Sequence, residues 1–595
     1  MDRKNNTDKW KAVDWFLITT QVFRIQRQIY ESARRGDTKT THKLQKLLTK
    51  SHSAKLLAVR LAAELSKGKH TPGVDGISSL TPAQKASMAE TLNIGQKPLS
   101  VKRIEIPKEG KPATRKRGKQ AIRKQMKLEV RRQGKQETRK LGIPAMRDRA
   151  LQHLINMALE PVADQSLSPH QYGFRKGRKQ QDALEAIRSN IRLCPLWVLS
   201  IDIEKFFDKI SHEALFIKVN APRGIQNAIE RILRARIRAG DVYHSPEEGT
   251  PQGGPLSPLL ANIALSGLEE AIKGEFPKHA RINGQRIDRE PRIIIYADDA
   301  VILHPRKEVL VEIQSFINDW LNELGLNLNS DKTKIAHTLE KKDGLAGFDF
   351  LGCHIQQHQI GKHQGKPFFK GVITMITPSK ASQKRLQTNA RELIKSHSPS
   401  KKHNAKYLKE LATGMANRQE RLLYGLNRII RGWSNYHRYN NSKETFSKMD
   451  HHIHEKLWKW AIRLNPNKPR KWIVQEYFNN ASPWTFKTRH PKGKDVKRFL
   501  CSEVPIEKHT LVIPDKSYFD GDWPYWAKRQ GRYLSIPGSI AQRIQSQGGK
   551  CSGCSKAFTR TDHVKLVPRK GLKGGSFKAA MCRQCIKDTS EDRDA

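Results

Sequence analysis

The sequence lacks any long apolar run. No window reaches the roughly 18 apolar residues that a membrane-spanning helix needs. Residues 1–30 mix Asp, Lys and Arg with short apolar stretches, whereas a signal peptide has a continuous apolar core. These absences argue against a membrane-inserted or exported chain. We therefore expect a cytoplasmic protein with no membrane partner.

Cysteine and acidic residues are both scarce. Only seven Cys occur in 595 residues, which argues against a disulfide framework. The 58 Asp and Glu face 110 Lys and Arg, a formal net charge of +52. A fold with this excess repels itself unless a polyanion neutralises it, so the charge favours a large nucleic-acid partner. A cationic membrane-surface protein is the alternative, but no amphipathic anchor accompanies the charge.

The length implies about two to four domains, and the patterns differ along the chain. Residues 10–66 carry apolar residues at helical spacing. From 145 to 360 short apolar strands alternate with helices, which is typical of an α/β fold. Residues 375–480 are helical and basic, and residues 481–545 are irregular. We find no internal repeat.

Two segments place acidic residues at the ends of apolar strands. Leu199 to Asp202 is a strand that delivers Asp202, and Ile293 to Tyr296 is a strand that runs into Asp298 and Asp299. Nucleotidyl transfer uses two Mg²⁺ ions, which prefer carboxylate, phosphate and water oxygens. Three carboxylates from adjacent strand ends suit that chemistry. The alternative for a single Asp-Asp pair is a solvated turn.

At these residues the sequence resembles a known family. Tyr296-Ala-Asp-Asp299 resembles the catalytic box of reverse transcriptases, and the order of the neighbouring motifs resembles group II intron-encoded proteins across about residues 10–480. The motifs are Gln171-Tyr-Gly-Phe-Arg-Lys-Gly-Arg178, Gly249-Thr-Pro-Gln-Gly-Gly-Pro-Leu-Ser-Pro258, Leu324-Gly-Leu-Asn-Leu-Asn-Ser-Asp-Lys-Thr-Lys334 and Phe348-Asp-Phe-Leu-Gly352. The resemblance implies an α/β multidomain fold: a right-hand polymerase with fingers and palm, a helical thumb or maturase domain, and a small zinc-binding C-terminal domain.

The resemblance also implies roles for single residues. Asp202, Asp298 and Asp299 would hold two Mg²⁺ ions. The Ile203 amide would hold the triphosphate, and a ring at Phe207 would exclude a 2′-hydroxyl, although Phe207 could instead be a core residue. The other implied nucleotide-binding residues are Lys108, Arg139, Gln252 and Lys332. A tight turn and a solvent lysine are the alternatives for the last two. The chain departs from the family by about thirty basic and polar residues at 111–138, which makes the convergence of Lys108 and Arg139 depend on the insertion looping out.

Residues 425–439 resemble the maturase domain of the same family. Helical spacing brings Arg428, Arg431, Asn435 and Arg438 toward one side, with aromatic residues among them. Arginine pairs with phosphates and aromatic rings stack on unpaired bases, as in structured-RNA binding. The alternative is an amphipathic helix whose aromatic residues are core.

The tail contains two C-x-x-C pairs. Cys551 and Cys554 are followed after 27 residues by Cys582 and Cys585. This spacing predicts a tetrahedral, structural Zn²⁺ site, because thiolate ligands select zinc over magnesium. Between the pairs, Asp562 and His563 resemble the first His element of an HNH endonuclease, but the sequence offers no matching Asn and has no His after Cys582. We therefore expect a zinc-stapled DNA-binding module without good support for cleavage.

These observations predict a polymerase that binds its intron RNA, assists its splicing and copies it into DNA during retrohoming. The partners would be the intron RNA, dNTPs, target DNA with its primer, and in one option a second copy of the chain. The alternatives are a splicing cofactor with a dispensable polymerase, an RNA-copying RNA polymerase, and an HNH-type DNA endonuclease. The expected division is a helical RNA-binding extension at 1–95, fingers and palm at 96–365, thumb or maturase domain X at 366–480, a DNA-binding linker region at 481–545, and an HNH-like zinc domain at 546–595.

Overall fold

The fold is known from a computed structural model. It describes residues 9–107, 138–282, 285–341, 346–360, 371–397, 418–478, 485–489, 495–530, 532–533, 536–556, 558, 564–570 and 576–586. Within these ranges, none of the helices combines the length and the apolar character that crossing a bilayer requires.

The N-terminal region is helical, as the apolar spacing predicts. Asp14 caps the first helix by accepting N–H groups of Phe16 and Leu17, and Thr81 begins α5 with a capping box. Buried amides tie these helices to α7: Gln26 and Gln45 donate to backbone carbonyls of that helix. The elements are α2 (Trp15–Arg34), α3 (Thr38–Lys50), α4 (His52–Arg60), the π-helix η1 (Leu61–Leu65), the 3₁₀-helix η2 (Lys67–His70), α5 (Pro82–Thr91) and α7 (Met146–Ser166).

A four-stranded sheet of order β2-β1-β4-β5 follows in the chain. Its strands are β1 (Val101–Pro107), β2 (Thr138–Ile143), β4 (Ile237–Ala239) and β5 (Val242–His244). β1 and β2 pair antiparallel up to Pro107 opposite Thr138, so the insertion between them leaves from the end of a paired hairpin. The insertion itself lies outside the described residues.

The central sheet has the order β10-β3-β9-β8. Its strands alternate between two apolar cores: Leu199 and Ile302 face one, and Val198 and Val301 face the other. Both faces are therefore buried, which explains why these strands read as continuous apolar runs. The elements are α8 (Gln180–Ile191), β3 (Trp197–Asp202), α9 (Phe206–Lys209), α10 (His212–Lys218), α11 (Arg223–Leu233), α12 (Ser257–Ala264), α13 (Leu268–Glu275), β6 (Ala280–Ile282), β7 (Gln285–Ile287), β8 (Arg292–Tyr296), β9 (Asp299–His304), α14 (Lys307–Asn322) and β10 (Lys334–His337).

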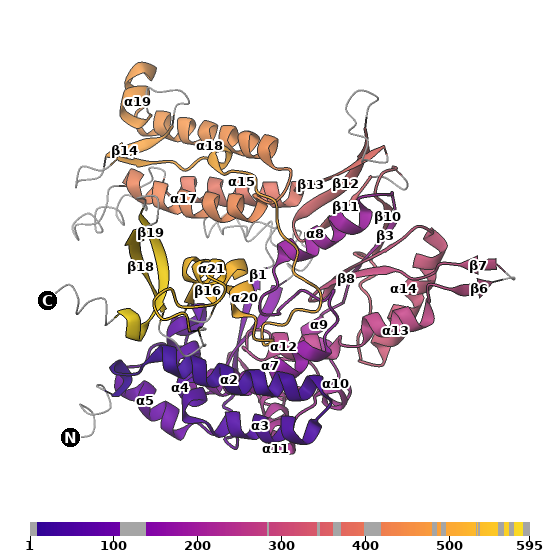
Figure 1. The fold of residues 1–595 in the computed structure, drawn as a ribbon. Helices are drawn as coiled ribbons and strands as arrows, with labels where there is room; N and C mark the ends of the chain where they lie inside the picture. The colour runs from indigo at the N-terminus through magenta and orange to yellow at the C-terminus, as the bar shows by residue number, and fades with distance from the viewer. Residues whose placement is uncertain are drawn as a thin grey trace.

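A three-stranded sheet and a helical lobe follow the central sheet. The strands are β11 (Phe348–Phe350), β12 (Cys353–Gln359) and β13 (Val372–Pro378). Because β13 pairs with β12 along its whole length, the expected boundary at 365/366 separates paired strands, and the helical lobe begins after Pro378 instead. The helices, seen as the orange layer in Figure 1, are α15 (Lys380–Ser396), α17 (Arg418–His437), α18 (Lys443–Leu464) and α19 (Arg470–Tyr477).

The region expected as a linker at 481–545 packs into two different cores. Phe486 and Cys501 are buried in the helical lobe, whereas Phe519 and Trp526 are buried against the central sheet and α2. The sequence did not predict this packing, because isolated aromatic residues without periodicity do not indicate which segments they pack against. The elements are β14 (Lys487–Arg489), β15 (Asp495–Lys497), the 3₁₀-helix η3 (Cys501–Glu503), α20 (Trp523–Gln530), β16 (Arg532–Tyr533), β17 (Ile536–Pro537), α21 (Gly538–Ser546), β18 (Val564–Lys570) and β19 (Ser576–Cys582).

Candidate active site

The paired aspartates lie on a tight hairpin between β8 and β9. Tyr296 pairs with Asp299, so Ala297 and Asp298 form a two-residue turn. Ala297 has φ 58°, a left-handed conformation that glycine adopts most readily, as the first position of such a turn requires. Gly173 packs against this turn, and a Cβ at Gly173 would lie 2.3 Å from the Ala297 nitrogen. The segment of Gly173 therefore supports the hairpin at a distance that only a residue without a Cβ allows.

Asp202 ends β3 directly opposite Asp299. The two residues are register partners in the antiparallel pair of β3 and β9, which sets their Cα atoms about 4.5–5.5 Å apart. Asp298 stands next to Asp299 at the tip of the same hairpin. The three carboxylates that the sequence singled out therefore meet at one end of the central sheet, although almost 100 residues separate Asp202 from the other two.

The surroundings of the aspartate hairpin raise the pKa values of Asp298 and Asp299. Burial, together with the charges of Asp298 and Asp202, raises the pKa of Asp299 to about 7. Burial and the charge of Asp202 also raise the pKa of Asp298, in part offset by Arg139 and Lys332. The site thus holds more negative charge than its own cations balance. An oxygen donor set of this kind fits divalent cations such as Mg²⁺.

Lys332 is the nearest cation to the carboxylates. Its ammonium donates to Asp202 Oδ2 at 2.8 Å, and its side chain is 60% exposed. Burial would lower the pKa of Lys332, but the hydrogen bond and charge of Asp202 outweigh it and the pKa is raised. The Asn329 amide also donates to the Asp202 carbonyl at 2.8 Å, which fixes the turn that carries Lys332 beside β3.

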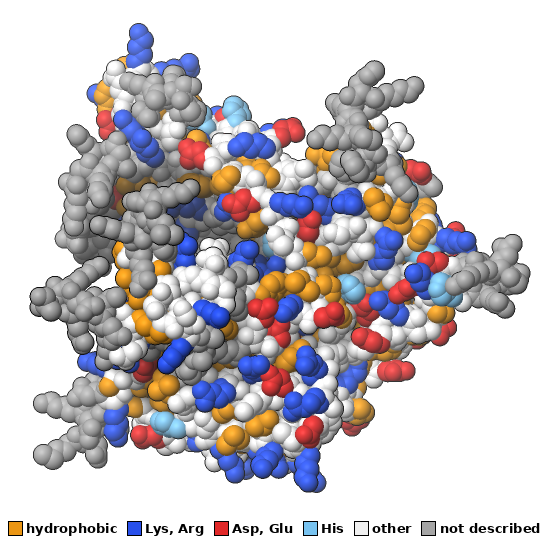
Figure 2. All heavy atoms as spheres, in the orientation of Figure 1, with side chains coloured by type: hydrophobic (Ala, Val, Ile, Leu, Met, Phe, Trp, Pro, Cys, Tyr) orange, Lys and Arg blue, Asp and Glu red, His pale blue; other side chains and the backbone are white. Residues whose placement is uncertain are grey.

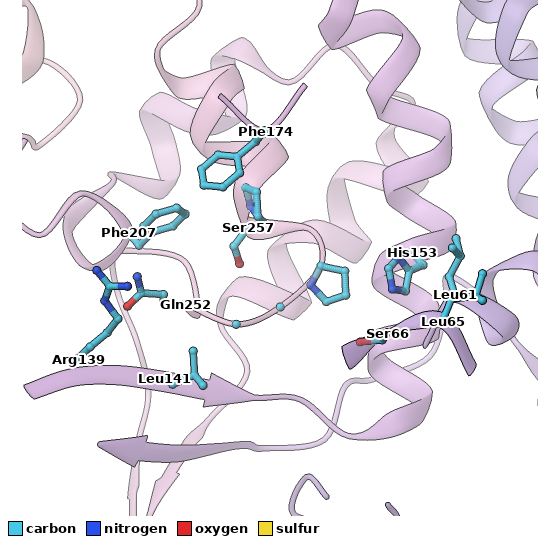
Figure 3. A pocket seen from close by; sticks show the side chains of 14 residues that line it. Leu61, Leu65, Ser66, Arg139, Leu141, His153, Phe174, Phe207, Gln252 and Ser257 are labelled. Atoms are coloured by element: carbon cyan, nitrogen blue, oxygen red, sulfur yellow. The ribbon is translucent and has the colours of Figure 1, made fainter. Parts of the chain in front are cut away.

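A pocket of about 630 Å³ opens beside this site. Three residues predicted to bind the nucleotide, namely Arg139, Phe207 and Gln252, lie at one end of it (Figure 3). The other end is formed by His153 and residues of the N-terminal helices, with the loop of Gln252 between the two ends. The lining residues are Leu61, Leu65, Ser66, Arg139, Leu141, His153, Phe174, Phe207, Gln252, Gly253, Gly254, Pro255, Ser257 and Pro258.

The structure separates the two rings of the Phe-Phe pair. Phe206 is buried in the core, whereas Phe207 is partly exposed and lines the pocket. Phe207 also contacts the ring of Phe174 edge-on, with ring centroids 6.3 Å apart. Sequence reasoning did not single out Phe174 as a site residue. Its one signal was an aromatic residue directly after a glycine in a basic loop, and the structure gives it a left-handed backbone with φ 55°.

The loop of Gln252 is wedged against the strand that carries Arg139. The Gly142 amide donates to the Gln252 carbonyl at 2.6 Å. Gly253 has φ 126°, and a Cβ there would lie 2.4 Å from the Gly142 carbonyl oxygen. This close backbone approach requires glycine, and it sets the Gln252 side chain next to the Arg139 side chain (Figure 3).

The remaining two residues that were predicted to bind the nucleotide at the fingers and palm are Ile203 and Lys108. The Ile203 side chain is buried in the core, and its backbone bridges to Leu328 beyond the end of β3. Lys108 lies outside the described residues, one position after the last paired residue of β1.

The cations of α17 differ in their surroundings. Arg428 and Asn435 are exposed, and Arg431 is exposed with its guanidinium 4.9 Å from the ring centre of Phe499. Arg438 is partly buried and forms an ion pair with Glu507. The aromatic residues Trp433 and Tyr436 point inward, donating to Ser382 Oγ and the Leu351 carbonyl. Figure 2 shows Lys and Arg side chains over the whole visible face, including the hollow beneath the helical lobe.

A second cluster of ligand atoms lies in the C-terminal region. The sulfur atoms of Cys551, Cys554, Cys582 and Cys585 all lie within 4.8 Å of one another. Amides of Gly553 and Cys582 donate to Cys551 Sγ at 3.4 and 3.3 Å. Burial alone would raise the pKa of the Cys551 thiol, but these amide hydrogen bonds lower it to about 6. Four converging sulfurs, one of them favoured as a thiolate, can hold a metal ion. Asp562 and His563 lie outside the described residues.

The comparison with protein families matches three stretches of the chain. Residues 10–92 match the N-terminal domain of reverse transcriptase, residues 122–355 match reverse transcriptase (RNA-dependent DNA polymerase), and residues 401–478 match the group II intron maturase-specific domain. The first match falls on the helical N-terminal region, the second includes the central sheet, and the third includes helices of the helical lobe.

Curated relatives agree with these matches. The chain is 28% identical over 232 residues to a COX1/OXI3 intron 1 protein of Saccharomyces cerevisiae, covering 32% of this chain and 28% of that protein. It is 29% identical over 359 residues to protein YkfC of Escherichia coli, covering 53% and 82%. It is 35% identical over 124 residues to the group II intron-encoded protein LtrA of Lactococcus lactis, covering 20% of each. The chain thus matches only about a quarter of the length of two of these three. In sequence order, the chain therefore matches reverse transcriptase domains followed by a group II intron maturase-specific domain.

Proposed function

We propose that this chain is an RNA-directed DNA polymerase that binds its group II intron RNA, assists its splicing and copies it into DNA. The observation that carries the proposal is the convergence of Asp202, Asp298 and Asp299 beside a pocket lined by Arg139, Phe207 and Gln252. Neither a nucleic-acid-binding protein without enzymatic activity nor a nuclease acting through its tail needs this combination.

The three aspartates are the residues that would hold two Mg²⁺ ions. When bound, such ions activate the primer 3′-hydroxyl and stabilise the leaving pyrophosphate. Lys332 is poised for the same step. Its ammonium is largely exposed, so it would be able to leave Asp202 and pair with pyrophosphate oxygens. Arg139 extends from β2 toward Gln252 and Phe207 (Figure 3), and its charge acts on Asp298, so its guanidinium would pair with phosphate oxygens beside the aspartates.

The choice of deoxynucleotides follows from Phe207. Its ring lies at the pocket end that also holds Arg139 and Gln252, so the ring would contact the sugar of a nucleotide whose phosphates reach the aspartates. Contact between ring and sugar leaves no room for a 2′-hydroxyl. Gln252, presented by the glycine loop, would contact the base pair, and the Ile203 amide and Lys108 would complete the triphosphate site.

The arrangement supports a right-hand polymerase. The sheet β2-β1-β4-β5 with α2 to α5 would be the fingers, the central sheet the palm, and the helical lobe the thumb. Arg428, Arg431 and Asn435 present exposed polar groups on α17 of that lobe, and we assign them to intron RNA. Arg438 would join them only after leaving Glu507. The excess positive charge on the surface is consistent with a long RNA partner.

The C-terminal region would be a DNA-handling module stapled by zinc. Four sulfurs within 4.8 Å of one another match a closed, structural Zn²⁺ site better than a catalytic one, which keeps a position open for water. Lys565 on β18 and Lys578 on β19 are exposed and would face the target DNA, and the described residues between 485 and 530 would connect this module to the polymerase.

The proposal is tested by primer extension on poly(rA)/oligo(dT) with Mg²⁺. The wild type should incorporate dTTP and should strongly prefer it over UTP, and Asp298→Ala should incorporate neither. Intron splicing assayed with the same two proteins separates the two roles, because Asp298→Ala removes a carboxylate of the polymerase site and leaves the exposed residues of α17 unchanged. A wild type that supports splicing but never extends the primer would contradict the polymerase and leave a splicing cofactor.

A further inference from the structure

The segment 507–530, here named the strap, lies across the loop Gln171–Arg178, here named the palm loop. The strap follows the helical lobe in the chain but leaves it, and its Val512, Phe519 and Trp526 are buried against the central sheet and α2. Figure 1 shows the chain descending from the orange helices to α20 in the middle of the molecule. Neither the matched family stretches nor the chemistry above gives this segment a role.

A buried charge network joins both ends of the strap to α8. Asp182, fully buried at the start of α8, accepts hydrogen bonds from His509 Nε2 at 3.0 Å and from the Val512 amide at 3.1 Å, and pairs with Arg529. Burial would raise the pKa of Asp182, but its partners outweigh burial and lower it. Arg529 also donates to the Thr510 carbonyl at 2.7 Å.

The middle of the strap, from Pro514 to Trp526, packs directly on the palm loop. A Cβ at Gly177 would lie 2.3 Å from the ring of Trp526, so the ring occupies the space that glycine leaves open. Arg178 donates to the Pro514 carbonyl at 2.8 Å. Ser517 bonds to Asp164, and Asp164 in turn holds Arg175 of the palm loop at 2.8 Å.

The opposite side of the palm loop supports the reacting groups. The Tyr172 amide donates to the Ile295 carbonyl at 2.8 Å, and Gly173 packs on the Ala297 nitrogen of the aspartate hairpin. Phe174, the next residue, lines the nucleotide pocket and contacts Phe207. The palm loop therefore lies between the strap and the reacting site, and contacts both.

We propose that the strap is a positioning element of the polymerase, in which Asp182, Trp526 and Arg529 fix the palm loop and through it Phe174 and the aspartate hairpin. The inference rests on the proposed polymerase function. Burying a carboxylate and a guanidinium is a costly way to hold two segments together, and apolar packing would do so with less desolvation. What the network adds is one fixed register between strap and loop. A register error of about an ångström at a reacting group costs up to about 100-fold in rate.

The strap also joins the palm to the C-terminal module. α20 packs on α21, and Gln547, just after α21, exchanges hydrogen bonds with Ala580 of β19. Helix α20, which places Trp526 against Gly177, therefore also connects to the C-terminal module through α21.

The test compares Arg529→Gln with Lys528→Gln. Lys528 is the neighbouring residue, is exposed, and loses the same charge. Single-turnover extension of an annealed primer on RNA gives two quantities: the amplitude, which counts folded and competent molecules, and the rate constant of the step. We expect Arg529→Gln to lower the rate constant by about 10- to 100-fold with a KM for dTTP within about twofold of wild type. Lys528→Gln should match the wild type.

Two further variants keep the test decisive. Trp526→Phe retains an aromatic ring but fills Gly177's space less, so it should lower the rate constant in the same direction, and Arg529→Lys should recover part of the loss. If Arg529→Gln and Trp526→Phe lower only the amplitude and leave the rate constant unchanged, the strap is merely structural and the proposal fails. If the wild type and Lys528→Gln themselves do not extend the primer, the polymerase proposal fails instead.

Discussion

The palm and the C-terminal module bring ligand atoms together by different physical means. In the palm, Asp202, Asp298 and Asp299 stand at the ends of strands whose two faces are buried by two large cores. In the module, β18 and β19 form an isolated two-stranded sheet with a small core that includes Ile544, Ala579 and Met581. Two strands alone are marginally stable in water. We therefore expect the palm to fold without a metal, and the module to depend for its folding on a metal held by its four cysteines.

The same contrast appears in the charges. The palm holds its carboxylates together against their mutual repulsion, and burial and neighbouring charge raise the pKa of Asp299 to about 7. The module orients amide N–H groups toward Cys551 Sγ and so favours its thiolate. In the proposed function a bound cation would relieve the repulsion between the palm carboxylates, whereas the four sulfurs would hold a structural metal ion permanently. Experiments that remove ligands should separate the two.

The largest expected effect is that of Asp299→Asn. Removing one of three carboxylates that would hold the Mg²⁺ ions should lower primer extension by about a thousandfold or more, since charge stabilisation in the transition state is lost. The same change should raise the melting temperature in EDTA, because it removes one member of a crowded, buried group of charges. Thermal unfolding followed by circular dichroism and extension assays on one preparation check both. A variant that is inactive because it is less stable would contradict the assignment.

Removing a cysteine from the cluster should lower stability strongly and primer extension only slightly, the reverse of Asp299→Asn. Cys582→Ser is expected to unfold the C-terminal module, exposing residues 547–586 to proteolysis, and to weaken binding to duplex DNA by about tenfold or more. Extension of an already annealed primer should fall far less. Limited proteolysis and mass spectrometry with and without Zn²⁺ locate the change. Exposed Cys194 offers a matched control, since Cys194→Ser makes the same chemical change away from the cluster.

A smaller effect is expected at the sugar contact. Phe207→Val shortens the side chain at the pocket end that holds Arg139 and should raise UTP incorporation relative to dTTP by about tenfold, the scale that one apolar contact discriminates. The ratio of kcat/KM for the two nucleotides measures it. Phe206→Val is the contrasting change: Phe206 is buried, so its shortening should lower stability and leave the nucleotide ratio as in the wild type.

The sequence predicted those parts of the molecule that local pattern determines. Apolar strands ending in acidic residues gave the hairpin of Asp298 and Asp299 and the strand of Asp202, and cysteine spacing gave the cluster. Both patterns are short, and their chemistry needs no knowledge of distant contacts. Arg139 and Gln252 also line one pocket, whereas the predicted convergence of Lys108 and Arg139 involves a residue outside the described ones.

The sequence did not predict contacts between distant segments. Asp182 and Arg529 lie 347 positions apart, and nothing near either residue indicates the other. Trp526 follows a Trp-Pro turn signal in an irregular stretch, yet it is fully buried on Gly177. Arg438 has the helical spacing of an RNA contact but is paired by Glu507. In each case the environment of the residue depends on a contact with a distant segment, and such contacts produce no periodic pattern in the sequence.

The smallest expected effect is on the pH dependence of stability. Because the pKa of Asp299 is about 7 in the folded chain and near 4 when unfolded, the folded state binds the extra proton between these values. Its contribution to stability is therefore full below about pH 4 and is lost as pH rises through about 7. One such proton changes the unfolding free energy by at most about 1.4 kcal/mol per pH unit. Urea unfolding in EDTA from pH 5 to 8 should show this fall, Asp299→Asn should lack its share of it, and Mg²⁺ should offset it most at pH 8, where the carboxylates are ionised. An Mg²⁺ effect that is equal at pH 5 and pH 8 would mean that the ion binds away from the three aspartates.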